Sequence, residues 1–156
     1  MTRAVTSYSG SYRHTMDAKG RVSVPAEFRR AVGETFMMTR GHDECLYLYP
    51  MEEWELVEAE LSQLRFTSSR ARRYVRTMFE HARPVVVDSH GRVMVPQPLR
   101  EFAELDGEVL VNGVLHHIEI WNPTTREKYD NESDESYEDI SEDVWRHAKN
   151  GPGEEG

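Results

Sequence analysis

The sequence predicts an α+β, β-rich fold built from two copies of one small unit. Three observations lead to this prediction: a repeated 13-residue motif, an alternation of apolar and polar residues after the turn of each copy, and two helix-like segments between the copies. A chain of 156 residues allows one ordinary domain or two small ones. Small modules bury a smaller fraction of their surface, so we expect the two units to support each other.

An internal repeat organises the chain. Residues 17–29, with the sequence DAKGRVSVPAEFR, reappear as residues 88–100, with the sequence DSHGRVMVPQPLR, at a constant offset of 71. Seven positions are identical in the two copies: Asp, Gly, Arg, Val, Val, Pro and Arg. Each copy continues through a short helix candidate to an apolar strand, residues 45–49 in the first and 117–121 in the second. Self-similarity of this kind indicates one structural unit used twice.

Each copy opens with a pair of residues typical of a tight turn, namely Asp17 with Gly20 and Asp88 with Gly91. Aspartate hydrogen-bonds the backbone two residues on, and glycine adopts positive φ without a steric penalty. The residues that follow alternate with period two, which places Val22 and Val24 on one face and Arg21 on the other. Two β-rich units of this kind are expected to form a compact, closed, barrel-like body, because exposed strand edges invite aggregation.

Two helical segments are expected between the copies. Residues 51–64 and 68–82 carry apolar residues at helical spacing and are expected to pair as a hairpin. Thr67, Ser68 and Ser69 are N-cap candidates for the second helix. The same helix carries four arginines, Arg70, Arg72, Arg73 and Arg76. These arginines form either a solvated face or a second contact surface for phosphate or for a neighbouring subunit.

The expected organisation has four parts: a first repeat at 12–54, a helical linker or hairpin at 55–82, a second repeat at 83–125 and an acidic tail at 126–156. The tail is highly charged and poor in apolar residues, so we expect it to be disordered. Ile140, Val144 and Trp145 are placed to form one short amphipathic turn. Disorder is also expected for the last residues, 151–156.

The net charge of −9 is unevenly distributed. Residues 122–156 hold 11 acidic and 4 basic residues, a net charge of −7, which leaves 17 acidic and 15 basic residues, a net charge of −2, for residues 1–121. Of those 15 basic residues, 14 are arginine and one is Lys19. Arginine suits bidentate contacts to phosphate or guanine, although codon usage in a high-GC genome explains the same bias equally well.

The sequence also indicates a compartment. No apolar run approaches the roughly 20 residues of a membrane span, and the N-terminus lacks the apolar segment of a secretory signal. The single cysteine, Cys45, has no partner for an internal disulfide or a CxxC zinc site, which fits a reducing environment. We therefore expect a cytoplasmic protein in which Cys45 is a small, buried apolar residue.

Motifs of the common enzyme classes are not found in the sequence. None of the seven histidines belongs to an HExxH motif, and there is no GxSxG, P-loop or GxGxxG. His116 and His117 are adjacent and would point to opposite faces of a strand, which is a poor arrangement for binding one metal. Asp17 and Asp88 are already explained as turn formers. The sequence therefore predicts no catalytic residues, no metal site, no cofactor and no small-molecule substrate.

A binding function agrees better with the repeated polar positions, because these are basic. They are Lys19 and Arg21 in the first copy and His90 and Arg92 in the second. Two strands beside a turn can enter the major groove of DNA as a β-ribbon, where arginine pairs bidentately with guanine. The alternative is structural, with Arg21 in a salt bridge to the turn residue Asp17. Residue chemistry alone leaves both interpretations open.

The duplicated motif resembles that of the MraZ family of bacterial transcriptional regulators. The resemblance covers residues 12–129 and includes residues 17–25, the weaker second copy, and the segments 45–54 and 119–121. It implies two AbrB-like (SpoVT-AbrB) swapped-hairpin domains, packed as a pseudo-symmetric barrel-like body and assembled as a ring-shaped homo-oligomer. It also implies DNA contacts by Lys19 and Arg21. In the second copy Arg92 is the stronger candidate and His90 the weaker, because histidine replaces the lysine of the family motif.

Members of this family bind short G-rich direct repeats upstream of their own gene in the division and cell-wall gene cluster, usually as repressors. The resemblance therefore implies a cytoplasmic, nucleoid-associated protein that binds double-stranded DNA and no membrane. A ring would place several hairpins on one rim, where modest contacts add through effective concentration.

The acidic tail, which the resemblance does not explain, suggests two other roles. AbrB-like folds also serve as antitoxins, so the tail is a candidate for docking on a basic partner protein, which would make the chain a protein-binding module. Alternatively, the tail competes with DNA for the arginine-rich rim. In that case, deletion of residues 122–156 should tighten DNA binding at low salt.

Overall fold

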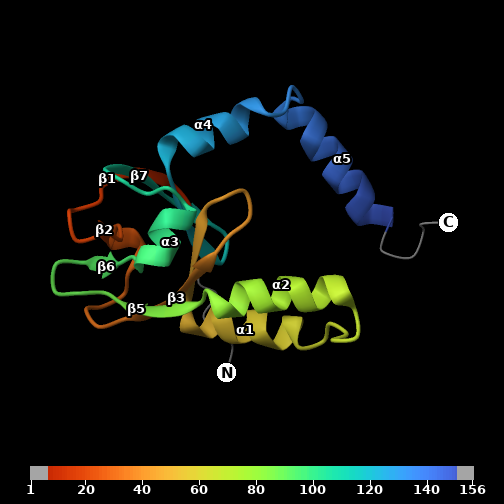
Figure 1. Cartoon of the computed structure of the whole chain (residues 1–156). Coiled ribbons are helices and arrows are strands. Elements are labelled where there is room, and N and C mark those ends of the chain that lie inside the picture. The colour runs from red at the N-terminus through yellow and green to blue at the C-terminus, as the bar shows by residue number, and fades with distance from the viewer. Residues whose placement is uncertain (1–6, 151–156) are drawn as a thin grey trace. The chain divides into compact units, whose positions relative to one another are not determined.

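Eight strands and six helical segments follow one another along residues 7–150 (Figure 1). The computed structural model describes residues 7–150. Its strands are β1 (Ser11–Thr15), β2 (Arg21–Ser23), β3 (Thr35–Arg40), β4 (Leu46–Pro50), β5 (Arg83–Val86), β6 (Arg92–Met94), β7 (Glu108–Val114) and β8 (His117–Trp121). Its helical segments are the 3₁₀ turn η1 (Ala26–Phe28) and the α-helices α1 (Met51–Leu61), α2 (Ser69–Glu80), α3 (Gln97–Phe102), α4 (Pro123–Asn131) and α5 (Tyr137–Asn150).

Each repeat contributes one strand to the other repeat. The main sheet has the strand order β1-β7-β8-β4-β3-β5, and every pair in it is antiparallel. β1 belongs to the first copy but pairs with β7 of the second, whereas β5 belongs to the second copy and pairs with β3 of the first. β4 and β8 join the two halves at the centre, with Tyr47 opposite Glu119. The prediction of an α+β fold with two swapped-hairpin repeats is confirmed.

β2 and β6 form a separate two-stranded ribbon, in which Val22 lies opposite Val93. β1 contacts β2, and β5 contacts β6. The expected closed barrel is not formed, because the main sheet ends at β1 and β5 and its ladder does not continue into the ribbon. Each ribbon strand has only three residues and is soon followed by a proline, Pro25 or Pro96. Proline has no amide hydrogen to extend a ladder.

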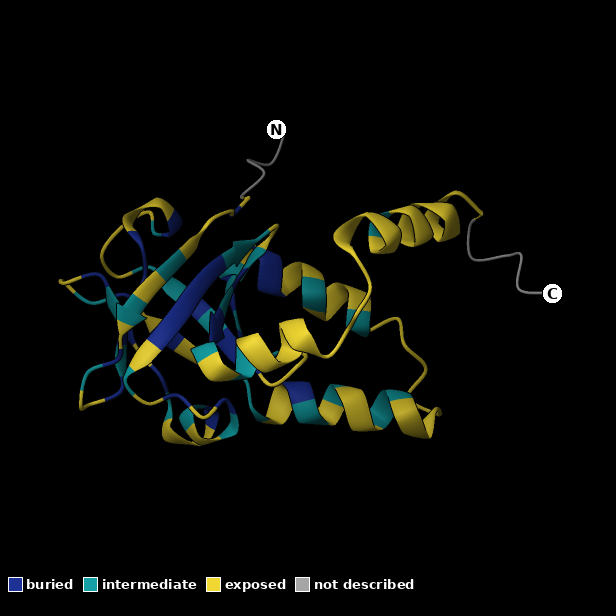
Figure 2. Cartoon of the chain, turned by 90° about the horizontal axis from the view of Figure 1, so that it is seen from above, coloured by how far each residue is buried: buried dark blue, intermediate teal, exposed yellow. Residues whose placement is uncertain are grey.

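The core is shared by the main sheet and the ribbon. Its fully buried side chains come from alternate strand positions, including Phe36, Met38, Leu46, Leu48, Ile118 and Ile120. The ribbon adds Val22 and Val93, which are buried as the alternation predicts. Figure 2 shows that buried residues are concentrated in the strands, whereas the helices are mostly exposed. Each fully buried aliphatic side chain contributes roughly 1.5–3 kcal/mol to the hydrophobic stabilisation.

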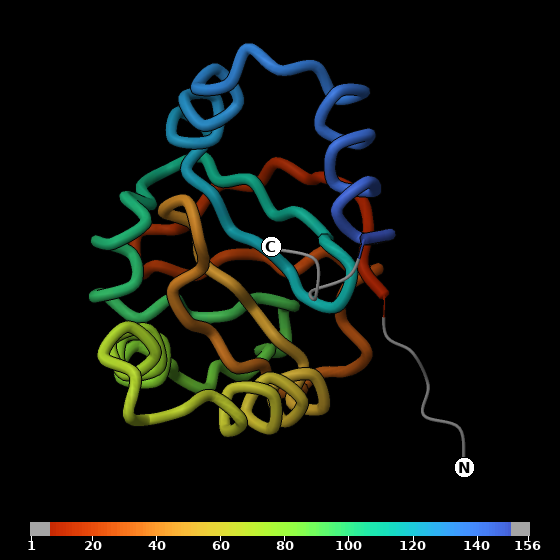
Figure 3. Tube along the Cα trace, turned by 90° about the vertical axis from the view of Figure 1, so that its right-hand side faces the viewer, coloured from red at the N-terminus to blue at the C-terminus, as the bar shows by residue number. Residues whose placement is uncertain are grey.

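α1 and α2 form the expected helical hairpin and lie side by side in Figures 1 and 3. α1 begins at Met51, as the helical spacing of residues 51–64 predicts, and ends at Leu61. The hydroxyl of Ser68 caps α2 by accepting the Ala71 amide at 3.2 Å. Trp54 of α1 packs on Phe79 of α2, with ring centroids 5.1 Å apart. No helix within residues 7–150 has the length and apolar character needed to cross a membrane.

The segment after Asn122 contains the helices α4 and α5, although its composition predicts disorder. Capping explains both helices. The side-chain oxygen of Asn122 accepts the Thr124 amide at 2.8 Å, and that of Ser136 accepts the Asp139 amide at 3.1 Å. α5 also has acidic residues in its first turn and basic residues in its last, which suits the helix dipole.

The chain divides into two units after Arg126. Residues 151–156, also expected to be disordered, lie outside the described part.

Cys45 is fully buried, as predicted, and its thiol donates a hydrogen bond to the His42 carbonyl oxygen at 3.2 Å. Burial raises the pKa of this thiol. The thiol therefore stays protonated, which makes it a poor nucleophile and a poor metal ligand.

Candidate nucleic-acid interface

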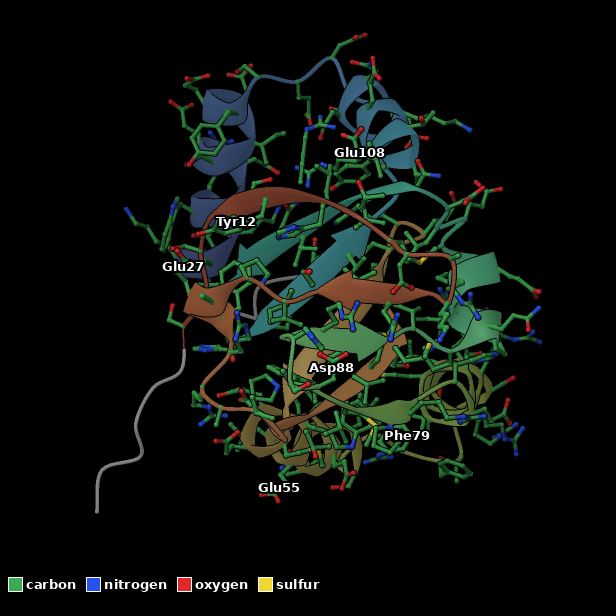
Figure 4. All side chains as sticks on the ribbon, turned by 90° about the vertical axis from the view of Figure 1, so that its left-hand side faces the viewer. Tyr12, Glu27, Glu55, Phe79, Asp88 and Glu108 are labelled. Carbon is green, nitrogen blue, oxygen red and sulfur yellow. The ribbon has the colours of Figure 1, made fainter. Side chains whose placement is uncertain are left out.

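The loops that carry the two turns extend to the same side of the molecule, which is on the left in Figure 1 and faces the viewer in Figure 4, where Asp88 is labelled. In the first turn, the Asp17 carboxylate accepts the amides of Lys19 at 3.0 Å and of Arg21 at 2.9 Å. The Gly20 amide donates to the Asp17 carbonyl oxygen at 3.0 Å, and Gly20 has a φ of 87°. Glycine is the residue that adopts this conformation at least cost.

The second turn repeats this geometry. The Asp88 carboxylate accepts the amides of His90 at 2.8 Å and of Arg92 at 3.0 Å. The Gly91 amide donates to the Asp88 carbonyl oxygen at 3.0 Å, and the φ of Gly91 is 78°. Replacement of the lysine by histidine in this copy therefore leaves the backbone of the turn unchanged.

Backbone hydrogen bonds connect the two turns to each other. The Val24 amide donates to the Gly91 carbonyl oxygen at 2.9 Å, and the Val95 amide donates to the Gly20 carbonyl oxygen, also at 2.9 Å. Each turn is thus held by the residue that follows the ribbon strand of the other copy. This reciprocal arrangement makes the two turns one structural unit.

The last identical position of the repeat, Arg29 in the first copy and Arg100 in the second, packs against the opposite turn. A Cβ added at Gly20 would lie 2.6 Å from the Arg100 guanidinium, and one added at Gly91 would lie 2.6 Å from that of Arg29. Arg29 Nε also donates to the Val24 carbonyl oxygen at 3.0 Å. The repeat marks both arginines by their identity but does not reveal this role, because the contacts join residues that are distant in sequence.

The two candidate arginines lie in a cluster with the turn aspartates. Arg21 Nε donates to Asp17 Oδ2 at 2.6 Å, and Arg92 Nε donates to Asp88 Oδ2 at 3.3 Å. Arg92 Nη1 also lies 3.6 Å from Asp17 Oδ2, so the cluster bridges the two copies. The salt bridge between Arg21 and Asp17, which the sequence offered as the alternative to DNA contact, is therefore present. The side chain of Arg21 remains 28% exposed and that of Arg92 remains 26% exposed. Within residues 7–150, the terminal nitrogens of Arg21 make no hydrogen bond or ion pair.

The turn geometry keeps both aspartates ionised. The amide of Arg21 is the main cause that lowers the pKa of Asp17, with further lowering by the Arg21 side chain and the Lys19 amide, to about 2. The pKa of Asp88 is lowered mainly by the amide of Arg92. At neutral pH the two carboxylates therefore balance the charges of the two arginines.

Lys19 and His90 are exposed at corresponding positions of the two turns. The Lys19 ammonium makes no hydrogen bond or ion pair with the described residues, whereas His90 Nδ1 lies 3.3 Å from the hydroxyl of Ser89. The four sequence-predicted residues thus form two classes. Lys19 and His90 are open to solvent, and Arg21 and Arg92 are half-buried and oriented by carboxylates.

The arginines of α2 also have mixed roles. Arg72 Nη1 donates to the carbonyl oxygens of Phe66 and Thr67, at 3.0 and 3.1 Å, and so supports the start of the helix. Arg76 lies over the Phe66 ring. Arg70 and Arg73, both exposed, make no hydrogen bond or ion pair within residues 7–150. Of the four α2 arginines, Arg72 and Arg76 therefore contact the protein, whereas Arg70 and Arg73 are exposed to solvent.

Glu119, on the central strand β8, is satisfied within the sheet. Its carboxylate hydrogen-bonds His117 Nε2 at 2.9 Å and accepts a hydrogen bond from Trp121 Nε1 at 2.9 Å. Burial raises the pKa of Glu119, but these hydrogen bonds and nearby positive charges outweigh burial, and the net shift is downward. In the part of the chain that the structure describes, no three His, Cys, Asp or Glu residues are grouped as metal ligands would be.

Known proteins match both copies of the repeat. The family model described as "MraZ protein, putative antitoxin-like" matches residues 8–77 and again residues 78–146, once for each copy. The chain belongs to the MraZ family. Both MraZ matches include one turn with its flanking strands, so each copy of the family unit supplies one half of the paired turns.

Individual MraZ proteins are similar over most of the chain. The transcriptional regulator MraZ of Carboxydothermus hydrogenoformans is 44% identical over 135 residues, which cover 86% of this chain and 94% of the relative. That of Halothermothrix orenii is 43% identical over 134 residues, with the same coverage. That of Desulfitobacterium hafniense is 40% identical over 137 residues, which cover 88% of this chain and 96% of the relative. Membership of the MraZ family places the chain among transcriptional regulators.

Proposed function

We propose that the chain is a sequence-specific regulator that contacts duplex DNA with its two paired turns. The contact residues are Lys19 and Arg21 in the first turn, and Arg92 with a weaker contribution from His90 in the second. The main support is the exposure of Lys19 on a turn that Asp17 holds rigid. A rigid contact loses little conformational entropy when it binds, and the major groove is wide enough for a two-stranded ribbon.

Lys19 and the arginines have different roles in this proposal. Lys19 acts as a point charge on a phosphate. Arg21 uses Nε for Asp17, which leaves its terminal nitrogens for the O6 and N7 atoms of a guanine. The carboxylate thus orients the guanidinium instead of competing with DNA for it. Asp88 orients Arg92 through Nε in the same way, but Arg92 Nη1 also lies 3.6 Å from Asp17 Oδ2, which leaves Nη2 as the terminal nitrogen for DNA.

The operator and the assembly follow from the family resemblance. The DNA site consists of short G-rich direct repeats upstream of the chain's own gene in the division and cell-wall gene cluster, and binding represses that gene at the nucleoid in the cytoplasm. A ring-shaped homo-oligomer presents several turns to successive repeats. The net charge of −9 supports this assembly, because a protomer with so few accessible cations needs multivalent contact.

The test is fluorescence anisotropy with duplex DNA from upstream of the gene and a scrambled duplex, each at two salt concentrations. Lys19→Ala should weaken binding to both duplexes and lower the slope of log K against log salt by about 1 for each phosphate that the lysine neutralises in the wild type. Arg21→Lys retains the charge but not the planar fork, so it should weaken binding to the operator by about tenfold and leave the scrambled duplex unaffected.

Arg65→Ala is the matched control, because it removes one exposed positive charge in the α1–α2 loop, outside the turns. It should bind both duplexes like the wild type. Light scattering of every variant establishes that the oligomer is unchanged. If Lys19→Ala and Arg65→Ala have equal effects, the turns are not the contact. If the wild type ignores both duplexes at low salt, the DNA proposal fails altogether.

A second candidate function is the binding of a basic protein by α5. This helix has an acidic first turn, and its apolar residues Ile140, Val144 and Trp145 are exposed. The description of the matching family as antitoxin-like agrees with it. Titration of a purified basic partner encoded beside the gene with wild type and Trp145→Ala tests this function. Equal affinity for the two proteins would exclude it.

A further inference from the structure

A cavity of about 270 Å³ lies at the end of β3, beside the turn that leads to β4. Its walls come from β3, β4, α2 and α3, and include Arg40, Tyr47, Tyr74, Met78 and Phe102. The lining is thus mainly aromatic and apolar. This volume is just below the usual range for small-molecule sites, about 300 to 1,000 Å³, so the cavity suits a small ligand. None of these residues belongs to the two turns proposed to contact DNA.

Arg40 supplies a positive charge that no carboxylate of the described residues balances. Its guanidinium carbon lies 4.3 Å from the centroid of the Phe102 ring. Its Nε is buried and has no hydrogen-bond partner, and the side chain forms no ion pair within residues 7–150. A partly desolvated charge of this kind is unfavourable unless it is paired. The cavity therefore suits an anionic group, which would bind the guanidinium through charge-assisted hydrogen bonds.

The aromatic walls are held in place. His42 stacks on Tyr74 with an interplanar angle of 15°, and its Nδ1 lies 2.9 Å from the Tyr47 hydroxyl. A Cβ added at Gly41 would lie 2.5 Å from the Tyr47 ring, so glycine is required for this close approach. The Thr39 hydroxyl donates a hydrogen bond to the Met78 carbonyl oxygen at 2.7 Å, and this bond connects α2 to β3. The cavity is preformed, which favours a rigid ligand.

We propose that this cavity binds a planar aromatic monocarboxylate as a small-molecule ligand. The carboxylate pairs with Arg40, and the ring lies against Tyr74 and Met78. The positive charge of Arg40 and the aromatic walls together determine which ligand binds. A neutral ring leaves Arg40 unpaired, and a small anion leaves the aromatic walls uncovered. The sequence gives no sign of this site, because its residues come from four separate elements.

The test uses 2-naphthoate as the probe and the full chain, with isothermal titration calorimetry. We expect one site per chain with a dissociation constant of about 10 μM to 1 mM, as is usual for a small ligand with one charged contact. Arg40→Met retains much of the side-chain volume without the charge and should weaken binding at least about tenfold. The neutral isostere 2-naphthamide should be weaker by a similar factor, in a comparison that needs no variant.

Arg73→Met is the matched control, because it removes an exposed charge from α2 outside the cavity wall. It should bind 2-naphthoate like the wild type. Amide chemical-shift changes should centre on Gly41 and Tyr74. Lack of binding, equal binding of 2-naphthoate and 2-naphthamide, or equal affinities of wild type and Arg40→Met would each overturn the proposal. Shift changes elsewhere would do the same. None of these outcomes depends on whether the chain binds DNA.

Discussion

Replacement of Gly91 by alanine tests whether the two repeats hold each other through Arg29. The φ of Gly91 is 78°, and a Cβ added there would lie 2.6 Å from the central guanidinium carbon of Arg29. Gly33 has a similar φ of 86°, but nothing lies within 4 Å of its added Cβ. Gly33→Ala is therefore a matched control, which meets the same backbone strain without displacing an arginine.

The expected magnitudes follow from these contacts. An alanine in the left-handed region costs roughly 1–2 kcal/mol, which applies to both variants. Displacement of Arg29 also breaks its hydrogen bond to the Val24 carbonyl oxygen, which contributes about 0.5–1.5 kcal/mol net. Gly91→Ala should therefore lower the free energy of unfolding by about 1.5–3.5 kcal/mol, and Gly33→Ala by about 1–2 kcal/mol. In an Arg29→Ala background, the two substitutions should cost the same.

Urea unfolding at one fixed protein concentration measures these differences, because the stability of an oligomer depends on concentration. Thermal unfolding provides a second readout, with a fall in Tm of about 2–4 °C for each kcal/mol in a chain of this size. An equal loss of stability in Gly91→Ala and Gly33→Ala would refute the reasoning. A difference that persists in the Arg29→Ala background would show that the arginine is not its cause.

Two further predictions concern pH and the core. Because the pKa of Asp17 is about 2 in the folded chain and its ordinary value is 3.8, the native state binds fewer protons than the unfolded state. The free energy of unfolding should therefore be constant above about pH 5 as far as Asp17 is concerned and fall between about pH 4 and pH 2. Asp17→Asn should flatten this fall in urea titrations, and an identical pH profile would contradict the assignment. In the core, Phe36 is completely buried, so Phe36→Ala should cost about 3–5 kcal/mol in urea unfolding. Val86 is 54% exposed, and Val86→Ala should stay within about 0.5 kcal/mol; comparable losses in the two variants would argue against this core.

Features that depend on neighbours in sequence could be predicted. The turn at Asp17 and Gly20 needs only residues three positions apart, and Ser68 caps the helix that directly follows it. The repeat therefore indicates the ribbon strands, the helical hairpin and the candidate cations. Composition was a poor guide to α4 and α5, because a cap such as Ser136 and the order of charges along a helix do not enter an average over the segment.

By itself, the sequence determined the duplicated unit, its turns and its basic positions, and these are enough to indicate the family. Only the tertiary structure decided that the main sheet stays open, that Arg92 of the second copy lies beside Asp17 of the first, and that Arg40 faces an aromatic cavity. The physical reason is that these features depend on contacts between segments far apart in the chain. Local patterns specify which residues are apolar or charged, whereas the pairing of strands and the packing of side chains decide which of them meet.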